Sequence, residues 1–399
     1  MRWLASILLL ISVSVYSQYL KPGKWRGIVH YSEQEVPFIF EVSYPTGSTP
    51  LFTFINGQER KVIDQVTIEN DTIIIPMKPF DVELRAAFTA MNMSGKYVKR
   101  YRGSSYRFSA DYGGTRLKKK SVRPSPPVEE RWDMTFEQGT SSESKGVGLF
   151  KQLGESVYGT ILTKTSDYRY FEGIMDGDSI KLSSFDGAHA FIILGKKVEG
   201  KWSGVMVFDD SYSENWSAVP DPDAELEDPF ELVKLEKGKH QPYYDLLGAG
   251  SGKGAIDPSK YEGKVLVIQL FGTWCPNSHD QTQYLVDWAK SKKPDGVEIL
   301  ASSYEANYSQ EYGLARIEAY VADNVIPYPV VLGGRLSKRA AAIPFPFMDR
   351  IEAFPTLVIV DKQGYVRYVH SYFTGPATGT YYNVFDRRFN EIINELISE

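Results

Sequence analysis

The sequence of 399 residues contains a single cysteine, Cys275. One cysteine cannot form a disulfide within the molecule, so a small fold held together by disulfides is excluded. The histidines, aspartates and glutamates show no grouping with the spacing of metal ligands, and we expect neither a metal nor another cofactor. Chemistry at sulfur is therefore confined to one position.

The sequence also lacks an excess of positive charge. Its 45 Lys and Arg stand against 50 Asp and Glu, a net charge of −5, which argues against nucleic acid as a partner. A hydrophobic content of 42% and a charged content of 24% are those of an ordinary globular protein with ample material for cores. The length predicts two or three domains.

A long apolar run is absent as well, and the segment 1–17 has the pattern of a signal peptide. Arg2 precedes an apolar run from Leu4 to Val15, and Val15-Tyr16-Ser17 resembles a cleavage site. The run is shorter than the roughly 20 residues of a membrane-spanning helix, and no cysteine for a lipoprotein anchor lies near Ser17. We expect a soluble, exported protein without a stable membrane span, in the periplasm if the source is Gram-negative.

Residues 18–208 have the pattern of an all-β barrel or sandwich domain. Runs such as Pro37 to Ser43 and Leu51 to Ile55 predict strands, and Asn56-Gly57 predicts a hairpin. A Pro-rich bridge at 113–127 divides the region into possible halves. We favour one barrel built from both halves over two small β domains, because each half alone offers few strands to bury its aromatic residues.

The stretch from Asp209 to Pro229 is acidic, contains proline and has neither Lys nor Arg. This composition is typical of a solvated loop, so we assign residues 209–245 to an acidic linker and domain junction. The alternative is a site for a cation or a basic partner.

From residue 246 to residue 399 strands and helices alternate, which predicts an α/β domain. The run from Val265 to Phe271 predicts a buried parallel strand, and a helical pattern follows Cys275. A cysteine in the first turn of a helix meets unpaired backbone N–H groups and the positive end of the helix dipole. We therefore expect the pKa of Cys275 to lie below the ordinary thiol value of about 8.5. Pro276 suits the first helical turn.

This stretch resembles the active site of the TlpA-like family of thioredoxin-fold thiol-disulfide oxidoreductases. Trp274-Cys275-Pro276-Asn277-Ser278 is similar to the Trp-Cys-x-x-Cys site of that family, and Phe354-Pro355-Thr356 is similar to its cis-proline loop. The resemblance implies a thioredoxin-like fold for residues 246–399, a cis peptide bond at Pro355 and a nucleophilic thiol at Cys275. It also implies that Ser278 replaces the family's second cysteine, which resolves mixed disulfides.

Four further positions near the thiol have two interpretations or a limited role. The resemblance places Glu305 where relatives have an acid near the site; the alternative is an exposed loop carboxylate. Ser278 either donates a hydrogen bond to the thiolate or is an ordinary hydroxyl. Gln269 stands where thioredoxins have a buried acid, and a neutral amide cannot relay a proton. His279 could pair with Cys275, but we favour a surface position.

A peroxiredoxin would resemble this chain in using one cysteine, but it would have Thr or Ser where Gly272 stands. Two functions remain. In the first, Cys275 attacks disulfides of client proteins and an external thiol resolves the mixed disulfide; a dimer linked through Cys275 is a competing product. In the second, the protein is a redox-inactive binding module whose β domain mediates protein interaction.

We favour the first function because Trp274, Cys275, Pro276 and the Phe354-Pro355-Thr356 loop occur together. The candidate catalytic residues are Cys275, Trp274, Pro276, Ser278, Pro355 and Glu305.

Overall fold

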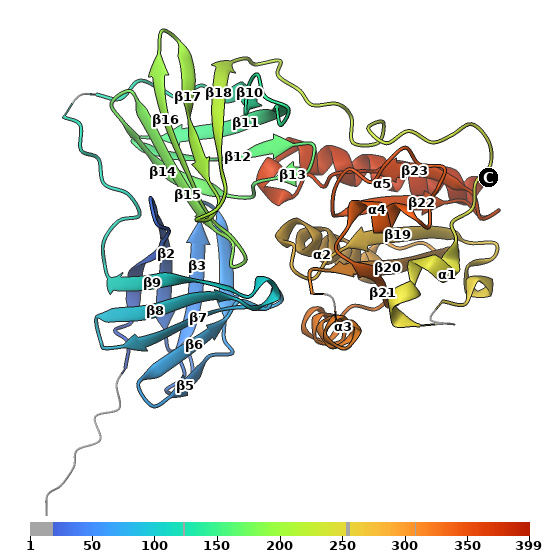
Figure 1. Cartoon of the computed structure of the whole chain (residues 1–399), viewed down its shortest axis with the longest axis horizontal. Coiled ribbons are helices and arrows are strands. Elements are labelled where there is room, and N and C mark those ends of the chain that lie inside the picture. The colour runs from blue at the N-terminus through green and yellow to red at the C-terminus, as the bar shows by residue number, and fades with distance from the viewer. Residues whose placement is uncertain (1–18, 123, 253–255, 308) are drawn as a thin grey trace, which may run out of the picture.

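The structure is a computed structural model that describes residues 19–122, 124–252, 256–307 and 309–399. The predicted signal peptide at 1–17 lies outside the described residues. Figure 1 shows a β-rich part beside an α/β part, joined by a long connecting segment. Within the described ranges, every helix is too short or too polar to cross a membrane.

The N-terminal half of the β-rich part is a nine-stranded antiparallel sheet in the spatial order β4-β3-β2-β1-β9-β8-β7-β6-β5. Its strands are β1 (Gly23–His30), β2 (Glu35–Ser43), β3 (Leu51–Asn56), β4 (Glu59–Ile63), β5 (Thr67–Glu69), β6 (Thr72–Pro76), β7 (Val82–Phe88), β8 (Asn92–Lys99) and β9 (Ser104–Tyr112). Alternation in β3 buries Phe52 and Phe54 and leaves the side chain between them partly exposed, as expected of a sheet with one face inward.

A second sheet follows the Pro-rich bridge. Its strands are β10 (Arg131–Phe136), β11 (Ser144–Leu153), β12 (Ser156–Thr163), β13 (Ser166–Asp167), β14 (Phe171–Asp176), β15 (Ser179–Phe185), β16 (Ala190–Val198), β17 (Lys201–Val207) and β18 (Ser213–Pro220). They lie in the order β11-β10-β18-β17-β16-β15-β14-β12-β13, and an additional pairing between β11 and β12 closes the sheet on itself. We call both sheets together, β1 to β18, the β module.

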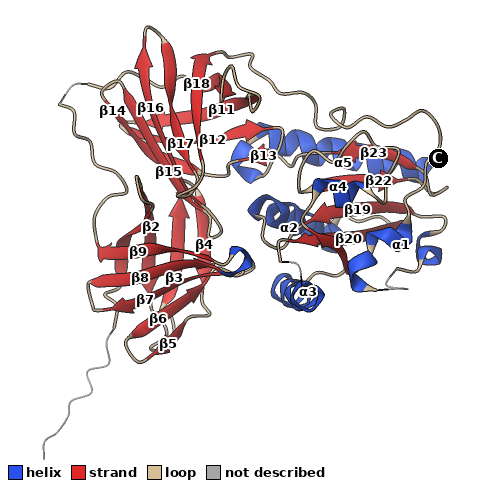
Figure 2. Ribbon diagram, in the orientation of Figure 1, coloured by secondary structure: helices blue, strands red, loops and turns tan. Residues whose placement is uncertain are grey.

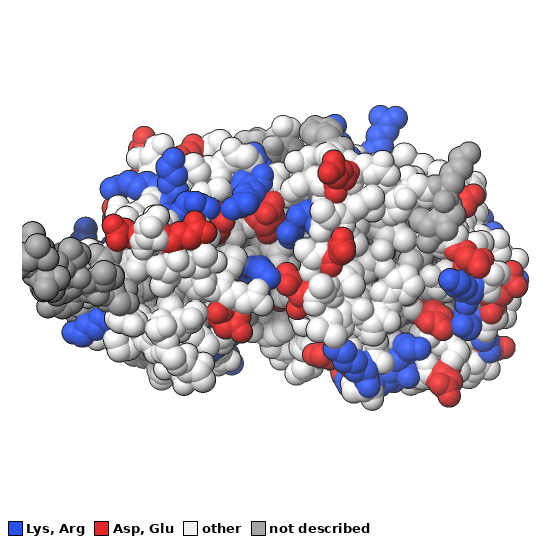
Figure 3. Space-filling view, turned by 90° about the horizontal axis from the view of Figure 1, so that it is seen from below, with Lys and Arg blue, Asp and Glu red and all other residues white. Residues whose placement is uncertain are grey.

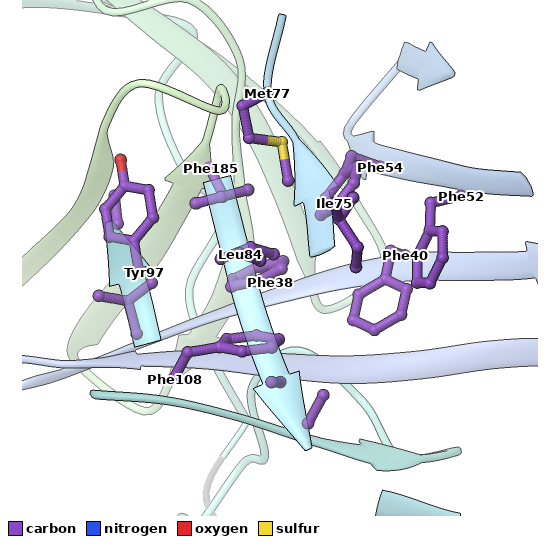
Figure 4. Close-up of a cluster of buried hydrophobic side chains, with 14 of the residues drawn as sticks. Phe38, Phe40, Phe52, Phe54, Ile75, Met77, Leu84, Tyr97, Phe108 and Phe185 are labelled. Carbon is purple, nitrogen blue, oxygen red and sulfur yellow. The ribbon is translucent and has the colours of Figure 1, made fainter. Parts of the chain in front are cut away.

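The preference for one barrel built from both halves was therefore wrong. Each half forms nine strands of its own, which is enough to bury its aromatic residues. The two sheets nevertheless share a core, because Phe185 of β15 stacks on Phe38 of β2 with ring centroids 4.2 Å apart. Figure 4 shows Phe185 among the aromatic side chains of the first sheet.

The acidic stretch after residue 208 is not all loop. It contains β18, which pairs with β10 and β17. Trp216 and Ala218 on this strand are buried, and Ser217 between them is partly exposed. The prediction of a loop was wrong for these residues, because it rested on their acidic composition and not on the short alternation of apolar and polar residues.

The C-terminal domain is built on a five-stranded sheet in the order β21-β20-β19-β22-β23. Its strands are β19 (Val265–Phe271), β20 (Val297–Glu305), β21 (Val330–Arg335), β22 (Thr356–Val360) and β23 (Val366–His370). β20 runs parallel to β19 and β21, while β22 runs antiparallel to β19 and β23. Every residue of β19 is buried, which fits a central strand covered on both faces.

Helices cover this sheet, and Figure 2 shows them gathered in the C-terminal domain. They are α1 (Tyr244–Leu247), α2 (Pro276–Ser291), α3 (Gln310–Asn324), α4 (Lys338–Ala342) and α5 (Thr380–Ser398), with short 3₁₀ turns η2 (Ala249–Ser251), η3 (Pro258–Tyr261) and η4 (Pro376–Thr378). A further 3₁₀ turn, η1 (Arg100–Arg102), lies between β8 and β9 in the first sheet. Val265 and Val267 face α2 and α5, whereas Leu266 and Ile268 face a core that includes α1 and α4. A β-rich region followed by a thioredoxin-like α/β domain confirms the predicted fold class.

The surface carries both signs of charge. Figure 3 shows basic and acidic side chains interspersed over the face that it presents. Among the described residues, no group of three or more His, Cys, Asp or Glu has the arrangement of a metal site.

Candidate active site

Cys275 lies at the N-cap of α2, directly after the loop that leaves β19. The Ser278 backbone N–H donates to Cys275 Sγ at 3.5 Å, and the thiol donates to the Phe354 carbonyl at 3.7 Å. The Phe354–Pro355 peptide bond is cis. The structure thus places the thiol between the start of α2 and the Phe354-Pro355-Thr356 loop.

Glu305, at the end of β20, fixes the loop that carries the thiol. Its carboxylate accepts hydrogen bonds from the Thr273 hydroxyl at 2.8 Å, from the Thr273 N–H at 3.1 Å and from the Ser303 hydroxyl. Only 2% of Glu305 is exposed, so it is not a solvated loop carboxylate. Through these hydrogen bonds Glu305 holds Thr273, the residue two positions before Cys275.

Trp274 also holds the loop that carries Cys275 in place. Its indole N–H donates to the Tyr304 carbonyl at 2.9 Å, and its ring lies edge-on to Phe354 with centroids 6.5 Å apart. A side chain at position 272 would meet Trp274 Nε1 at 2.2 Å. Gly272 therefore permits the indole to fold back over the backbone, which a serine or threonine there would not.

The pKa of the Cys275 thiol is raised, contrary to the expectation from the helix terminus. Burial is the main cause; the Ser278 hydroxyl and the N–H groups of Ser278 and Asn277 lower the pKa, while the nearby Asp186 carboxylate raises it further. Only 7% of Cys275 is exposed. The helix start does favour the thiolate, but the loss of water outweighs it.

Ser278 and Gln269 are both buried behind the thiol. Ser278 Oγ has no hydrogen-bond partner of normal geometry among the described residues. The Gln269 amide donates to Gln281 Oε1 and Thr282 Oγ1, both at 3.2 Å, and so links β19 to α2. Through these hydrogen bonds Gln269 holds β19 and α2 together inside the domain.

The β module supplies contacts that sequence reasoning did not find. Arg169, in the turn after β13, donates to the Pro276 carbonyl at 3.4 Å and forms ion pairs with Asp280 of α2 and Glu59 of β4. Asn277 donates to the Asp167 carbonyl at 2.9 Å. These residues lie more than a hundred positions from Cys275, so no local pattern could connect them with the thiol.

His279 is half-buried and not freely exposed, so the surface position that we favoured was only partly right. Its ring lies edge-on to Phe80 of the β module at 5.6 Å and to Tyr320 of α3 at 6.2 Å. Burial, together with the positive charges of Lys61 and Arg169, holds the pKa of His279 well below its ordinary value. The imidazole is therefore neutral at physiological pH.

The part of the β module near the thiol is charged. Asp186, between β15 and β16, is buried, and burial raises its pKa; its partners His189, Arg169 and Lys61 nevertheless lower that pKa to about 2. Burial lowers the pKa of Lys61 to about 8. Asp186 thus places a negative charge near the thiol, whereas Lys61 and Arg169 place positive charge near His279.

The C-terminal domain is similar in sequence to a known family and to named proteins. Residues 237–369 match the AhpC/TSA family, a thioredoxin-like family. The chain is 27% identical over 135 residues to the thiol-disulfide oxidoreductase ResA of Bacillus thuringiensis subsp. konkukian, which covers 33% of this chain and 68% of that protein. It is 30% identical over 79 residues to the thiol:disulfide interchange protein DsbE of Vibrio cholerae serotype O1, covering 20% of this chain and 41% of that protein.

Solved structures include a thiol:disulfide interchange protein of the thioredoxin family from Chlorobium tepidum TLS. It is 18% identical, with a TM-score of 0.28, and the match covers 41% of this chain and 97% of that one. The matched range 237–369 contains Cys275, Glu305 and Pro355. By sequence, the C-terminal domain is similar to the proteins named thiol-disulfide oxidoreductase ResA and thiol:disulfide interchange protein DsbE.

Proposed function

We propose that this protein is an exported, TlpA-like thiol-disulfide oxidoreductase that works with one cysteine. The observation that carries the proposal is the position of Cys275, at the N-cap of α2 and within 3.7 Å of the carbonyl that precedes Pro355. The similarity to proteins named thiol-disulfide oxidoreductases supports it. Export rests on the pattern of residues 1–17.

In the proposed reaction the Cys275 thiolate attacks one sulfur of a client disulfide. A bond forms between Cys275 Sγ and that sulfur, the client S–S bond breaks, and the second client sulfur leaves as a thiolate that takes up a proton. One external thiol then releases the client from Cys275, and a second external thiol frees Cys275. The balance is one client disulfide reduced to two thiols and two external thiols oxidised to one disulfide.

The residues around the thiol have separate roles in this proposal. The N–H of Ser278 stabilises the thiolate, and Glu305 keeps the loop at Thr273 in place. Trp274 and Pro355 shape the surface that a client would meet, and Pro276 begins the helix. The Ser278 hydroxyl cannot act as a second thiol, because a hydroxyl does not attack sulfur at neutral pH.

The experiment that tests the proposal introduces the missing thiol with Ser278→Cys. An internal thiol can act at an effective concentration on the order of 10⁵ M, which an external thiol at millimolar levels cannot match. We expect the parent to accumulate a mixed disulfide with a model disulfide substrate, visible by mass spectrometry, and Ser278→Cys to turn the substrate over without accumulation. Cys275→Ser is the matched control and should form no adduct.

If the parent and Ser278→Cys both fail to react, even after the thiol is made accessible, the proposal is wrong. The protein would then be a binding module with a thioredoxin-like domain.

A further inference from the structure

The β module contacts the first turns of α2 from one side through the turn between β12 and β14. Arg169 in this turn is only 7% exposed; it donates to the Pro276 carbonyl and pairs with both Asp280 and Glu59. The Asp167 carboxylate accepts the Arg169 N–H at 2.7 Å and the Gly375 N–H at 2.8 Å. The turn is therefore fixed both within the β module and against the C-terminal domain.

A second set of contacts lies on the other side of the thiol, through the segment between β6 and β7. Phe80 packs against His279, and Asp81 accepts a hydrogen bond from the Tyr312 hydroxyl of α3 at 2.5 Å. Arg316 of α3 donates to the Pro79 carbonyl. Trp274 itself packs against the core of the first sheet.

These two sets of contacts leave Cys275 almost without access. Disulfide exchange needs a client sulfur to reach Cys275 Sγ and form a bond of about 2.05 Å with it. A thiol that is 7% exposed, beside a helix held by loops of the β module, cannot meet the disulfide of another protein. The arrangement that the structure shows is a closed one.

The closed arrangement leaves polar atoms unsatisfied on both sides. The Tyr101 hydroxyl from the β module and His279 Nδ1 from α2 are buried, and neither has a hydrogen-bond partner among the described residues. Tyr101 lies close enough to Cys275 for their charges to interact. Separation of the two parts would return both atoms to water, which lowers the cost of opening.

The junction is also incompletely packed. An open pocket of about 650 Å³ lies between the second sheet and the C-terminal domain, lined by Leu149, Tyr158 and Pro376 to Tyr381 among others. Part of the junction is therefore already exposed to solvent. A single covalent connection, residues 221–243, joins β18 to α1, so the two parts can separate without breaking either fold.

We propose that the β module is a built-in cover for Cys275, held shut mainly by Arg169 and by the contacts of Asp81 and Pro79 with α3, and that it must move away before the thiol reacts. The role of this cover in regulating disulfide exchange rests on the proposed function of the protein as an oxidoreductase. Its presence can be tested without that function, because thiol accessibility does not depend on a disulfide substrate.

The experiment measures the alkylation rate of Cys275 by iodoacetamide in the full chain. Arg169→Met leaves Asp280 and Glu59 without their cation, and we expect the rate to rise about tenfold or more as the open population grows. The double variant Tyr312→Phe/Arg316→Met weakens the other contact from the α3 side alone, and should also raise the rate. The matched control is Arg116→Met, since Arg116 is as buried as Arg169 but pairs with Glu172 inside the β module.

Circular dichroism first establishes that each variant is folded. A control rate close to that of the parent, with faster alkylation in both cover variants, supports the cover. If the parent reacts as fast as the chain unfolded in urea, or if both cover variants keep the parent rate, the cover is wrong. Fast alkylation of an opened variant that forms no mixed disulfide would instead reject the proposed oxidoreductase and leave the cover intact.

Discussion

Arg169 and Asp280 stand 111 positions apart in the sequence, yet their side chains form an ion pair beside the first turns of the helix that Cys275 caps. One residue belongs to the second β sheet and the other to the thioredoxin-like domain. The β module therefore takes part in the surroundings of the thiol, because its Asp186 carboxylate raises the pKa of Cys275 further.

The pKa of Cys275 provides the first prediction. In the full chain, the alkylation rate plotted against pH should have its midpoint above the ordinary thiol value of about 8.5, because burial opposes the thiolate. In Arg169→Met, water reaches the sulfur while the Ser278 and Asn277 N–H groups stay, so the midpoint should fall below that of the parent. Equal midpoints would mean that the β module does not control the desolvation of the thiol.

The difference between sequence and structure at this site has a clear physical origin. The strand, the cysteine at the helix start and the helix after it follow from local pattern, and the structure has all three. The surroundings of the thiol include residues distant in sequence, such as Asp186 and Tyr101, so a pKa argument from the helix terminus alone had the wrong sign. Likewise, turn and strand patterns located the β strands, but they could not tell one sheet from two, since pairing depends on distant partners.

The second prediction concerns Glu305. Glu305→Gln keeps the size of the side chain but replaces one acceptor oxygen with an NH₂ group that faces the donors of Thr273 and Ser303. We expect a loss of about 1–3 kcal/mol in the free energy of unfolding, measured by urea denaturation. Glu298→Gln on the same strand is the control: Glu298 pairs with Lys264 in a partly exposed bridge, and its loss should cost less than about 1 kcal/mol. Equal losses would argue against a special role for Glu305.

The third prediction is an acid sensitivity set by His370. Its ring lies between Phe230 and Phe385, at 4.6 and 4.7 Å, and both ring nitrogens are buried without partners among the described residues. Burial lowers the pKa of His370 from 6.5 to about 3. The folded state therefore binds fewer protons than the unfolded state, so stability is complete above pH 6.5 and is lost as the pH falls toward 3.

For this one group the full loss is on the order of 5 kcal/mol, at about 1.36 kcal/mol per pKa unit. We expect His370→Leu to flatten the dependence of the free energy of unfolding on pH in that window, measured by urea denaturation at a series of pH values. His240→Leu is the control, since His240 stacks on Phe347 at the edge of the domain. A slope that survives in His370→Leu would assign the acid sensitivity to other groups.

The last prediction concerns the disulfide-linked dimer that a lone cysteine makes possible. Two copies of Cys275 must bring their Cα atoms to about 4.4–6.8 Å to form a disulfide. The β module lies over the first turns of α2 and contacts Pro276, Asn277 and Asp280, so a second copy cannot come that close. We therefore expect the parent to stay monomeric after treatment with an oxidant such as diamide, as judged by non-reducing electrophoresis.

Arg169→Met should form the dimer under the same conditions, because opening of the cover exposes the sulfur. The dimer should disappear on reduction and should be absent from Arg169→Met/Cys275→Ser, which keeps the open arrangement without the thiol. A parent that dimerises as readily as Arg169→Met would show that the contacts of Arg169 do not keep partners away from Cys275. Dimerisation thus reports on access by a whole protein, the size of partner that a client disulfide would bring, whereas alkylation reports on access by a small molecule.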